Sequence, residues 1–439
     1  MNYNTYATYH QGIHRQQPSV SFQYAATPVF ASELATHTGM RTSEINAAFT
    51  RLKGGIIDRG IQYANNTVAS RGGYMAENFV AESYNLDAVL KNINTPSATV
   101  PAENGRASAD VVYSGGKASL KFYVDAESSG KAQLNPEYGD QARIVPSDQL
   151  DDAKATVTKM ADRNEVKGRT EAAQQQRDVA DKLTDRIIDE NGVESTPLTK
   201  QQDLDLAKAI QKDASGNIIV DEAKMDQVLE DTGISERVRT TKLRNELTGL
   251  GMVAAMGLGM GFTMSLVSGL ARVGLDSEKI SDVVFDSLTA GTESGTIAAV
   301  TYAAGRGTTH LMESVGLNLM SSAGYIANFA TVGVLSTSII CIYQFTKLKL
   351  NGASTDEALN ITGRTSMSSM TMLVVSLAAQ GIWGGPSGII VSTGAGLALL
   401  IMDAGKTVHA RKLETRLREY SIEEYKNIID SKKSIYIMN

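Results

Sequence analysis

The sequence predicts an α+β N-terminal domain, in which helices flank a small sheet, followed by a mainly α-helical C-terminal region of apolar, glycine-rich helices. Two observations predict this division. Residues 150–246 are rich in Lys, Arg, Asp, Glu and Gln, whereas residues 247–402 contain few charges and most of the long apolar runs. Strand-like patterns occur in the first half, at residues 109–124. A chain of 439 residues is long enough for two or three domains.

The first hundred residues divide into a lead-in and a helical segment. Residues 1–30 are rich in Tyr, Gln and Asn with little periodicity, so we expect a flexible lead-in there. Apolar residues recur at helical spacing over residues 32–66, where a break is expected at Gly54-Gly55. Residues 74–90 are expected to continue as a helix.

A β-hairpin is predicted where the periodicity changes. Residues 109–113 and 118–124 have the composition of strands, and they are joined by a turn at residues 114–116. Ile144-Val145, before a proline, suggests a third strand. The predicted α+β domain therefore spans residues 31–150.

The polar segment 151–246 is expected to be a charged helical connector. A helix that begins near Ser147 and a second helix over residues 169–189 predict a solvated helical pair. Turns and further helices are then expected at residues 191–192 (turn), 200–213 (helix), 216–217 (turn) and 221–231 (helix).

The C-terminal region contains three candidate membrane spans. They are Leu247–Leu270, Leu319–Phe345 and Met370–Met402, the last of which is broken at residues 384–386. A crossing helix needs about 20 apolar residues, so the first two are long enough. A weaker helix is expected over residues 276–312, and an amphipathic helix over the C-terminal segment 403–439.

The best-formed signal in this region is a four-residue repeat of small side chains. The two rows are Gly257, Gly261, Ser265 and Gly269, and then Gly384, Gly388, Ser392 and Gly396. Such rows let a second helix backbone approach closely, as in helix association within lipid. They predict helix packing and a homo-oligomer. Two interpretations remain open, which are membrane insertion and a soluble bundle or oligomer core.

Basic residues flank the first two candidate spans. Arg237, Arg239, Lys242 and Arg244 precede the first span, and Lys347 and Lys349 follow the second. By the positive-inside rule both flanks stay cytoplasmic, which requires an even number of crossings between them. The first residues lack a basic segment followed by an apolar run, so we expect no cleavable secretory signal. The expected location is the bacterial cytoplasm or inner membrane, with the N-terminal domain cytoplasmic.

Several function classes lose their main sequence support. A net charge of −6 does not suggest a nucleic-acid coat or a polybasic membrane binder. The single cysteine, Cys341, excludes a disulfide framework and a CxxC zinc site. No HExxH, Walker A or GxSxG pattern occurs.

One stretch, residues 73–150, resembles a known family. The resemblance lies in residues 73–79, 84–88, 109–111, 120–123, 134–138 and 145–150. In these residues the chain resembles proteins of phages and mobile elements that carry a restriction-endonuclease-like, PD-(D/E)XK-type core. The resemblance implies a metal-dependent nuclease with nucleic acid as its partner.

The resemblance also implies roles for three residues. Glu77 on a helix and Asp110 on the first hairpin strand would hold Mg²⁺, which prefers carboxylate oxygens. Lys121 on the second strand would stabilise the attacking hydroxide or the phosphate. The chain departs from the family at Ser119, where Glu, Asp or Gln normally supplies another metal ligand. The structural alternative makes Glu77 a solvated helix face and Lys121 an edge-strand charge.

Three functions follow. The first is a phage or mobile-element effector whose nuclease-like domain is tethered to membrane-inserting or oligomerising helices. The second is a non-enzymatic membrane-active, pore-forming or virion DNA-translocation protein, in which the glycine rows carry the activity. The third is a structural protein that assembles through its apolar helices.

Overall fold

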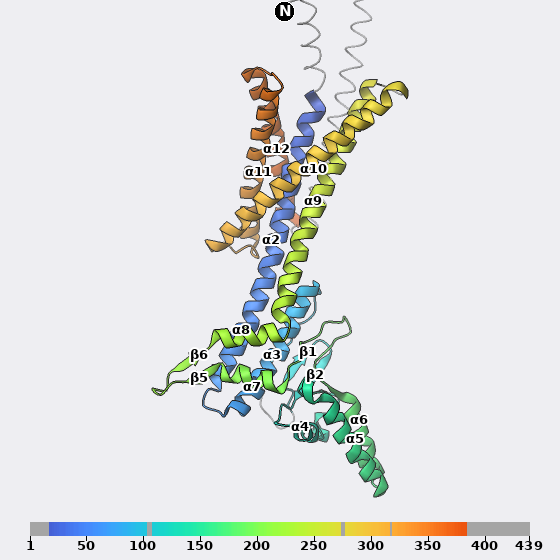
Figure 1. Ribbon diagram of the computed structural model, residues 1–439, viewed down its shortest axis with the longest axis vertical. Coiled ribbons are helices and arrows are strands. Elements are labelled where there is room, and N and C mark those ends of the chain that lie inside the picture. Colours follow the sequence, from blue (N-terminus) through green and yellow to red (C-terminus); the bar gives the residue numbers. More distant parts are fainter. Residues whose placement is uncertain (1–16, 103–107, 274–276, 317, 384–439) are drawn as a thin grey trace, which may run out of the picture. The chain divides into compact units, whose positions relative to one another are not determined.

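The computed structural model describes residues 17–102, 108–273, 277–316 and 318–383 (Figure 1). The chain forms two compact units. One is the α+β unit, Thr42–Arg244, and the other is the helical unit, which combines Met1–Arg41 with Asn245–Asn439. Two long helices, α2 (Gln17–Gln62) and α9 (Ile234–Val273), contribute residues to both units.

Helices make up most of the α+β unit. Helix α3 (Val68–Lys91) begins where the Thr67 side chain accepts a hydrogen bond from the Ser70 N–H. It ends at Asn92, whose left-handed backbone, with φ of 57°, lets its N–H bond the last turn. The shorter helices are α4 (Ala126–Ala132), α5 (Leu150–Val166), α6 (Thr170–Lys182), α7 (Lys200–Lys208) and α8 (Glu222–Asp231), with 3₁₀ turns η1 (Pro136–Tyr138) and η2 (Ser147–Gln149).

A four-stranded mixed sheet lies within this unit, in the order β1-β2-β3-β4, and Figure 1 labels its first two strands. Strands β1 and β2 form the antiparallel hairpin, and β3 and β4 join it in parallel. The strands are β1 (Val111–Tyr113), β2 (Gly116–Leu120), β3 (Ala142–Ile144) and β4 (Leu183–Thr184), and a separate antiparallel hairpin consists of β5 (Ile210–Lys212) and β6 (Ile218–Val220). The predicted hairpin and third strand are confirmed, whereas β4, β5 and β6 were not predicted.

The core of the α+β unit joins segments from its whole length. Leu52 of α2 and Phe79 of α3 belong to the same fully buried cluster as Val111 of β1. Leu206 of α7 and Met225 of α8 belong to it as well. The segment 151–244 is therefore part of one compact unit with residues 42–150, rather than a connector between domains. The apolar residues that this segment buries are dispersed among charged residues, so the sequence pattern does not indicate that they form part of a core.

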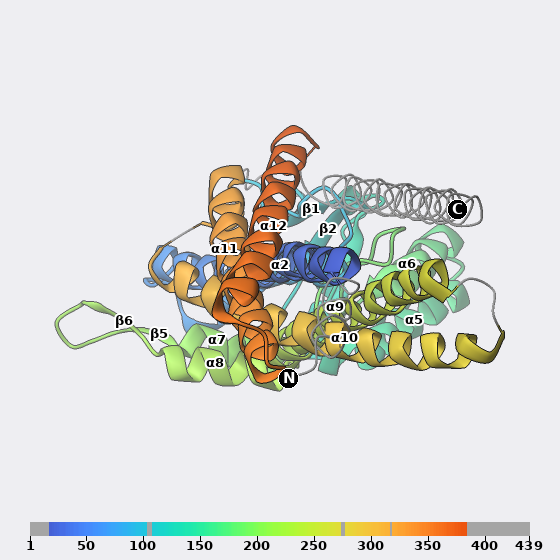
Figure 2. The ribbon, with the colours of Figure 1, turned by 90° about the horizontal axis from the view of Figure 1, so that it is seen from above.

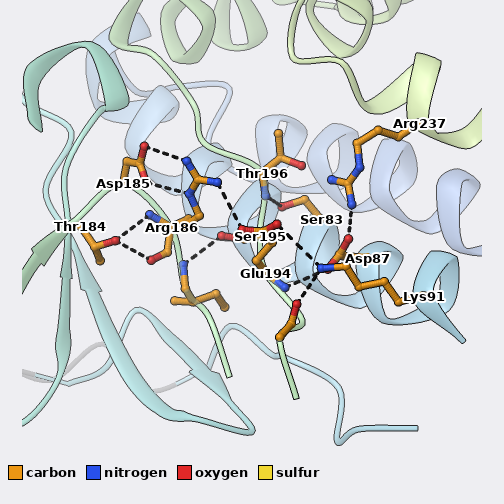
Figure 3. Close-up of polar contacts among 12 residues, drawn as sticks. Ser83, Asp87, Lys91, Thr184, Asp185, Arg186, Glu194, Ser195, Thr196 and Arg237 are labelled. Atoms are coloured by element: carbon orange, nitrogen blue, oxygen red, sulfur yellow. Dashed lines mark hydrogen bonds and ion pairs between the residues drawn. The ribbon is translucent and has the colours of Figure 1, made fainter. Parts of the chain in front are cut away.

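The loop after β4 is tied to α3 by buried polar contacts (Figure 3). The Glu194 N–H donates to the Asp87 carboxylate at 2.9 Å, and the Thr196 N–H donates to the Ser83 hydroxyl at 3.0 Å. Asp87 also pairs with Lys91 and with Arg237 of α9. These contacts hold α3, and therefore the side chains on its other turns, in one position relative to the sheet.

Among the described residues, three long helices lie wholly within the helical unit. Helix α10 (Ser277–Ser314) packs on α11 (Ser322–Leu350), and α11 packs on α12 (Thr355–Trp383), as both Figure 1 and Figure 2 show. Residues of α2 and α9 join them in a small core of Ala31, Ala35, Val253, Ala298, Tyr302 and Val332.

Two predictions for α2 are wrong. Residues 17–30, expected to belong to a flexible lead-in, are helical. No break occurs at Gly54-Gly55, because the buried side chains of Leu52 and Ile56 hold the helix on both sides of the glycines. A glycine inside a helix costs only about 1 kcal/mol, which such burial offsets.

One residue of the first glycine row, Gly257, lies where two helices cross. A Cβ atom added to Gly257 of α9 would lie 2.7 Å from the Ser294 carbonyl oxygen and 3.0 Å from the Gly295 Cα of α10. The two backbones therefore cross closely at Gly257 and Gly295. The surroundings of Gly261 and Gly269 and the second predicted row, Gly384, Gly388, Ser392 and Gly396, lie outside the described residues, as does the predicted helix at 403–439.

The predicted spans fall on helices as far as the structure describes them. Leu247–Leu270 lies in α9, most of the second span lies in α11, and the third span coincides with α12 up to Trp383. Among the described residues, one helix segment, Ala323–Leu350, is long and apolar enough to cross a membrane, with a mean hydropathy of 1.7. Length and composition alone do not distinguish such a helix from the core helix of a soluble protein.

Candidate functional site

The structure brings the three predicted site residues together. Glu77 lies in the middle of α3, Asp110 directly precedes β1 and Lys121 directly follows β2. The hairpin register, in which Val111 pairs with Ala118, places Asp110 opposite Ser119, and Lys121 follows two residues later on the same side of the strand. The side chains of Asp110 and Lys121 form an ion pair in which Nζ and Oδ2 are 3.2 Å apart.

Asp110 is held by its neighbours on β2. Its Oδ2 atom accepts hydrogen bonds from the Leu120 N–H at 2.6 Å and from the Ser119 hydroxyl at 3.3 Å, besides the Lys121 contact. Ser119 is fully buried, so its hydroxyl is committed to this cluster. Ser119, where the sequence departs from the pattern of the family that it resembles, therefore donates a hydrogen bond to Asp110.

Glu77 is an unusual carboxyl group. Only 15% of its side chain is exposed, and Arg59 of α2 pairs with it at 3.2 Å. Burial and the charge of Asp110 raise the pKa of Glu77 to about 7, although Arg59 and Lys121 oppose the shift. Glu77 is thus neither a solvated helix face nor fully ionised at neutral pH.

Lys121 remains a cation. Burial alone would lower its pKa, but Asp110 and Tyr138 outweigh burial, so the pKa of Lys121 is raised. The ammonium lies over the Tyr138 ring at 5.1 Å from the centroid and donates to the Leu120 carbonyl at 2.9 Å. Its chemistry is therefore charge stabilisation, and it cannot serve as a base at neutral pH.

Buried polar residues position the loop that carries Tyr138. Arg143 of β3 donates to the Asn135 and Gly139 carbonyls, both at 3.4 Å, and its guanidinium lies 5.6 Å from the Tyr138 ring. Gln133 bridges β2 and β3 by donating to the Ser119 and Ile144 carbonyls at 3.0 and 2.9 Å. The loop geometry is thereby coupled to the strands that carry the site.

Sequence reasoning missed the group of side chains on the other side of Glu77. The Arg59 guanidinium lies 5.1 Å from the Tyr63 ring centroid and 5.9 Å from that of Tyr74. The two rings stack at 3.8 Å with an interplanar angle of 8°. The sequence contains a local indication of this group. Arg59 and Tyr63 are four residues apart, and Tyr74 and Glu77 are three residues apart, so the members of each pair can meet on one side of a helix.

The carboxyl groups of the site, Glu77 and Asp110, are of the chemical kind that could hold a magnesium ion. Mg²⁺ is commonly bound by one or two carboxylates and keeps several waters. Glu77 and Asp110 are close enough for the charge of Asp110 to raise the pKa of Glu77, and a divalent cation would relieve that repulsion. No cluster of three or more acidic, His or Cys side chains arranged for a metal occurs among the described residues.

No protein-family model matches the chain, and no match was found among the curated proteins or the solved structures. The mixed sheet with flanking helices is an α+β arrangement.

Proposed function

We propose that the α+β unit is a Mg²⁺-dependent nuclease domain of the restriction-endonuclease-like type, tethered to helices that insert into a membrane. The observation that carries the first part is the convergence of Glu77, Asp110 and Lys121 from a helix and two strands. The pKa of Glu77, which burial and Asp110 raise to about 7, supports this assignment, because strongly shifted carboxyl groups are frequent at catalytic sites.

Each residue has a distinct task in this proposal. A bound Mg²⁺ would supply an activated water and neutralise charge on the phosphate. Asp110 is oriented by the Leu120 N–H and the Ser119 hydroxyl, which both bind its Oδ2 atom, and it would be one of the two carboxylate ligands of the ion. The Lys121 ammonium stabilises negative charge that develops on the phosphate. Arg59 neutralises Glu77 in the metal-free protein.

Nuclease activity is tested by incubating the full chain with supercoiled plasmid and with labelled RNA, with Mg²⁺ or EDTA. Asp110→Asn and Lys121→Ala should abolish cleavage. Asp162→Asn is the matched control, since this carboxylate is 62% exposed and pairs only at the surface. Cleavage that persists in both site variants would refute the proposal.

Metal binding gives a readout that does not depend on activity. Isothermal titration of Mg²⁺ into the protein near pH 7 should release protons, because Glu77 must ionise to bind the cation. The heat should therefore change with the ionisation enthalpy of the buffer. Glu77→Gln should remove that dependence.

The polarity of the helical unit supports membrane insertion. In α11, every fourth residue from position 328 to 344 is buried, and this row mixes polar and apolar side chains, namely Asn328, Val332, Ser336, Ile340 and Gln344. On the opposite side, Ile342 is 68% exposed and Leu350 is 82% exposed. Large exposed apolar side chains, on a helix that buries three polar ones, favour a helix that faces lipid.

The neighbouring helices repeat the pattern. In α12, Thr365 and Ser369 are fully buried while Met367 is 75% exposed. In α10, Thr301 is fully buried while Phe285 is 72% exposed.

Hydrogen bonds between helices satisfy part of this polar interior. The Asn328 amide donates to Thr36 of α2 at 3.1 Å and to Thr309 of α10 at 3.0 Å. Arg306 of α10 pairs with Glu246 of α9, with Nε 3.0 Å from a carboxylate oxygen. Neutralised and hydrogen-bonded polar groups are what a helix bundle in lipid requires.

Insertion is tested by flotation of the full chain with liposomes of phosphatidylethanolamine and phosphatidylglycerol. Ile342→Asp should reduce the floating fraction, because it places a charge on the surface proposed to face lipid. Ile219→Asp is the control, on a residue that is 53% exposed in the α+β unit. Recovery of the parent as a defined oligomer without detergent would favour the soluble assembly instead.

A pore-forming or nucleic-acid-translocating protein is the second candidate, because the buried Ser, Thr, Asn and Gln side chains could also line a polar path. Dye release from sealed liposomes distinguishes the two. Release that is unaffected by Asp110→Asn would favour the second candidate, provided that cleavage is also absent.

A further inference from the structure

We propose that Tyr63 and Tyr74 form a stacking site for an unpaired nucleobase, so that the substrate class of the cluster is single-stranded nucleic acid. This inference rests on the proposed nuclease function, because it assigns a ligand to the surface next to Glu77. It is carried by the ring geometry and by the contacts of Arg59.

The rings are placed to receive a base. Each ring of the Tyr63–Tyr74 stack has one face covered by the other ring, and both residues remain partly exposed. The outer face of such a stack offers a base the parallel surface that bases prefer. Arg59 adds a cation beside the rings, which favours both stacking and a nearby phosphate.

Tyrosines contact both ends of the proposed reactive cluster. At one end, Arg59 joins the Tyr63–Tyr74 stack to Glu77 through its 3.2 Å ion pair. At the other end, Tyr138 lies against Lys121 and is also partly exposed. A strand whose phosphate reached Lys121 would therefore pass aromatic rings next to the cluster.

Two cations of this region, Arg59 and Lys121, keep 16% and 18% of their side chains exposed beside their carboxylate partners. A phosphate of a bound strand can therefore contact them.

The ring faces favour single strands over duplexes. Stacking on a side chain requires a base whose face is free, and bases inside a duplex are covered by their neighbours. A protein that held duplex DNA would instead need donors and acceptors that reach groove edges. The proposed site offers rings and a guanidinium, which recognise base faces with little sequence preference.

Binding is measured by fluorescence anisotropy in EDTA, so that no cleavage occurs. The full chain in detergent is titrated into a labelled oligothymidylate of about twelve nucleotides and into the same strand paired with its complement. The single strand should bind more tightly. The double variant Tyr63→Ala/Tyr74→Ala should weaken its binding about tenfold or more. Tyr63→Phe/Tyr74→Phe should bind like the parent, because the rings remain.

Ile219→Ala is the control for a change elsewhere on the surface of the same unit, and circular dichroism verifies that each variant folds. Crosslinking with 5-iodouracil in the oligonucleotide should label Tyr63 or Tyr74. Equal binding of duplex and single strand, no binding of either, or full binding by the alanine double variant would each overturn the inference. Cleavage by the alanine double variant would leave the nuclease proposal standing. Binding of the single strand by a parent protein that shows no cleavage would support the stacking site and contradict the nuclease proposal.

Discussion

Asp87 of α3 and Arg237 of α9 form an ion pair in which the carboxylate is completely buried and the guanidinium is partly exposed. Lys91 contacts the same carboxylate at 2.8 Å, and the Glu194 N–H occupies its Oδ2 atom. Asp87 therefore joins three segments that are distant in sequence, namely α3, the loop after β4 and the start of α9 (Figure 3).

Removing the buried carboxylate should destabilise the α+β unit strongly. Asp87→Ala leaves Lys91 and Arg237 without their partner and should lower the free energy of unfolding by about 3–5 kcal/mol. Urea unfolding followed by tyrosine fluorescence measures this loss. Arg239→Ala, whose ion pair with Glu236 is exposed, should cost less than about 0.5 kcal/mol. Equal effects of both variants would contradict the assigned role.

The raised pKa of Glu77 should make stability depend on pH. The folded protein holds this proton more tightly than the unfolded chain, because its pKa is about 7 rather than 4.5. The resulting stabilisation is complete below pH 4.5 and is lost as pH rises through 7. It amounts to about 3 kcal/mol for a shift of this size. Glu77→Gln should flatten the unfolding free energy across that range, whereas Glu82→Gln on the same helix should not.

Ser119 is the position at which a third carboxylate can be introduced. Ser119→Asp places another buried charge beside Asp110, so the melting temperature of this variant in EDTA should fall below that of the parent. Added Mg²⁺ should raise the melting temperature of this variant more than that of the parent, since the ion gains a ligand. Ser119→Ala, which only removes the hydroxyl bound to Asp110, should lose about 1 kcal/mol and show no larger magnesium effect.

The same substitution at two glycines of α9 should have different effects on stability. Gly257→Leu forces side-chain atoms against the α10 backbone, so it should lower the stability of the detergent-solubilised protein by about 1–3 kcal/mol. Nothing lies within 4 Å of the Cβ position at Gly251, so Gly251→Leu should be neutral or slightly stabilising. Thermal unfolding followed by circular dichroism compares them, and a Gly257→Leu variant as stable as the parent would refute the close crossing.

The sequence was sufficient to predict features that are determined locally. The β1–β2 hairpin is specified by alternation around the Ser114-Gly115 turn, and its register places Asp110 opposite Ser119, within reach of the Lys121 side chain. Strand β4, by contrast, has only two residues, Leu183 and Thr184, and its pairing depends on tertiary contacts.

Contacts between distant helices were beyond sequence reasoning. Arg59 and Glu77 lie on different helices, so no local pattern links them. The proposed boundary at residue 150 was wrong for a related reason. Leu206 and Met225 are too widely spaced among charged residues to signal a core, yet both are fully buried.

The insertion of the α+β unit between the two parts of the helical unit has a consequence during synthesis. Thr36 bonds Asn328, and 292 residues separate them. A ribosome that adds about 5–20 residues per second needs about 15–60 s to make that stretch. The first part of α2 must therefore wait for its partners until well after the nascent α+β unit has left the exit tunnel. During that interval the apolar side of this part of α2 is exposed, and a chaperone or targeting factor can bind it.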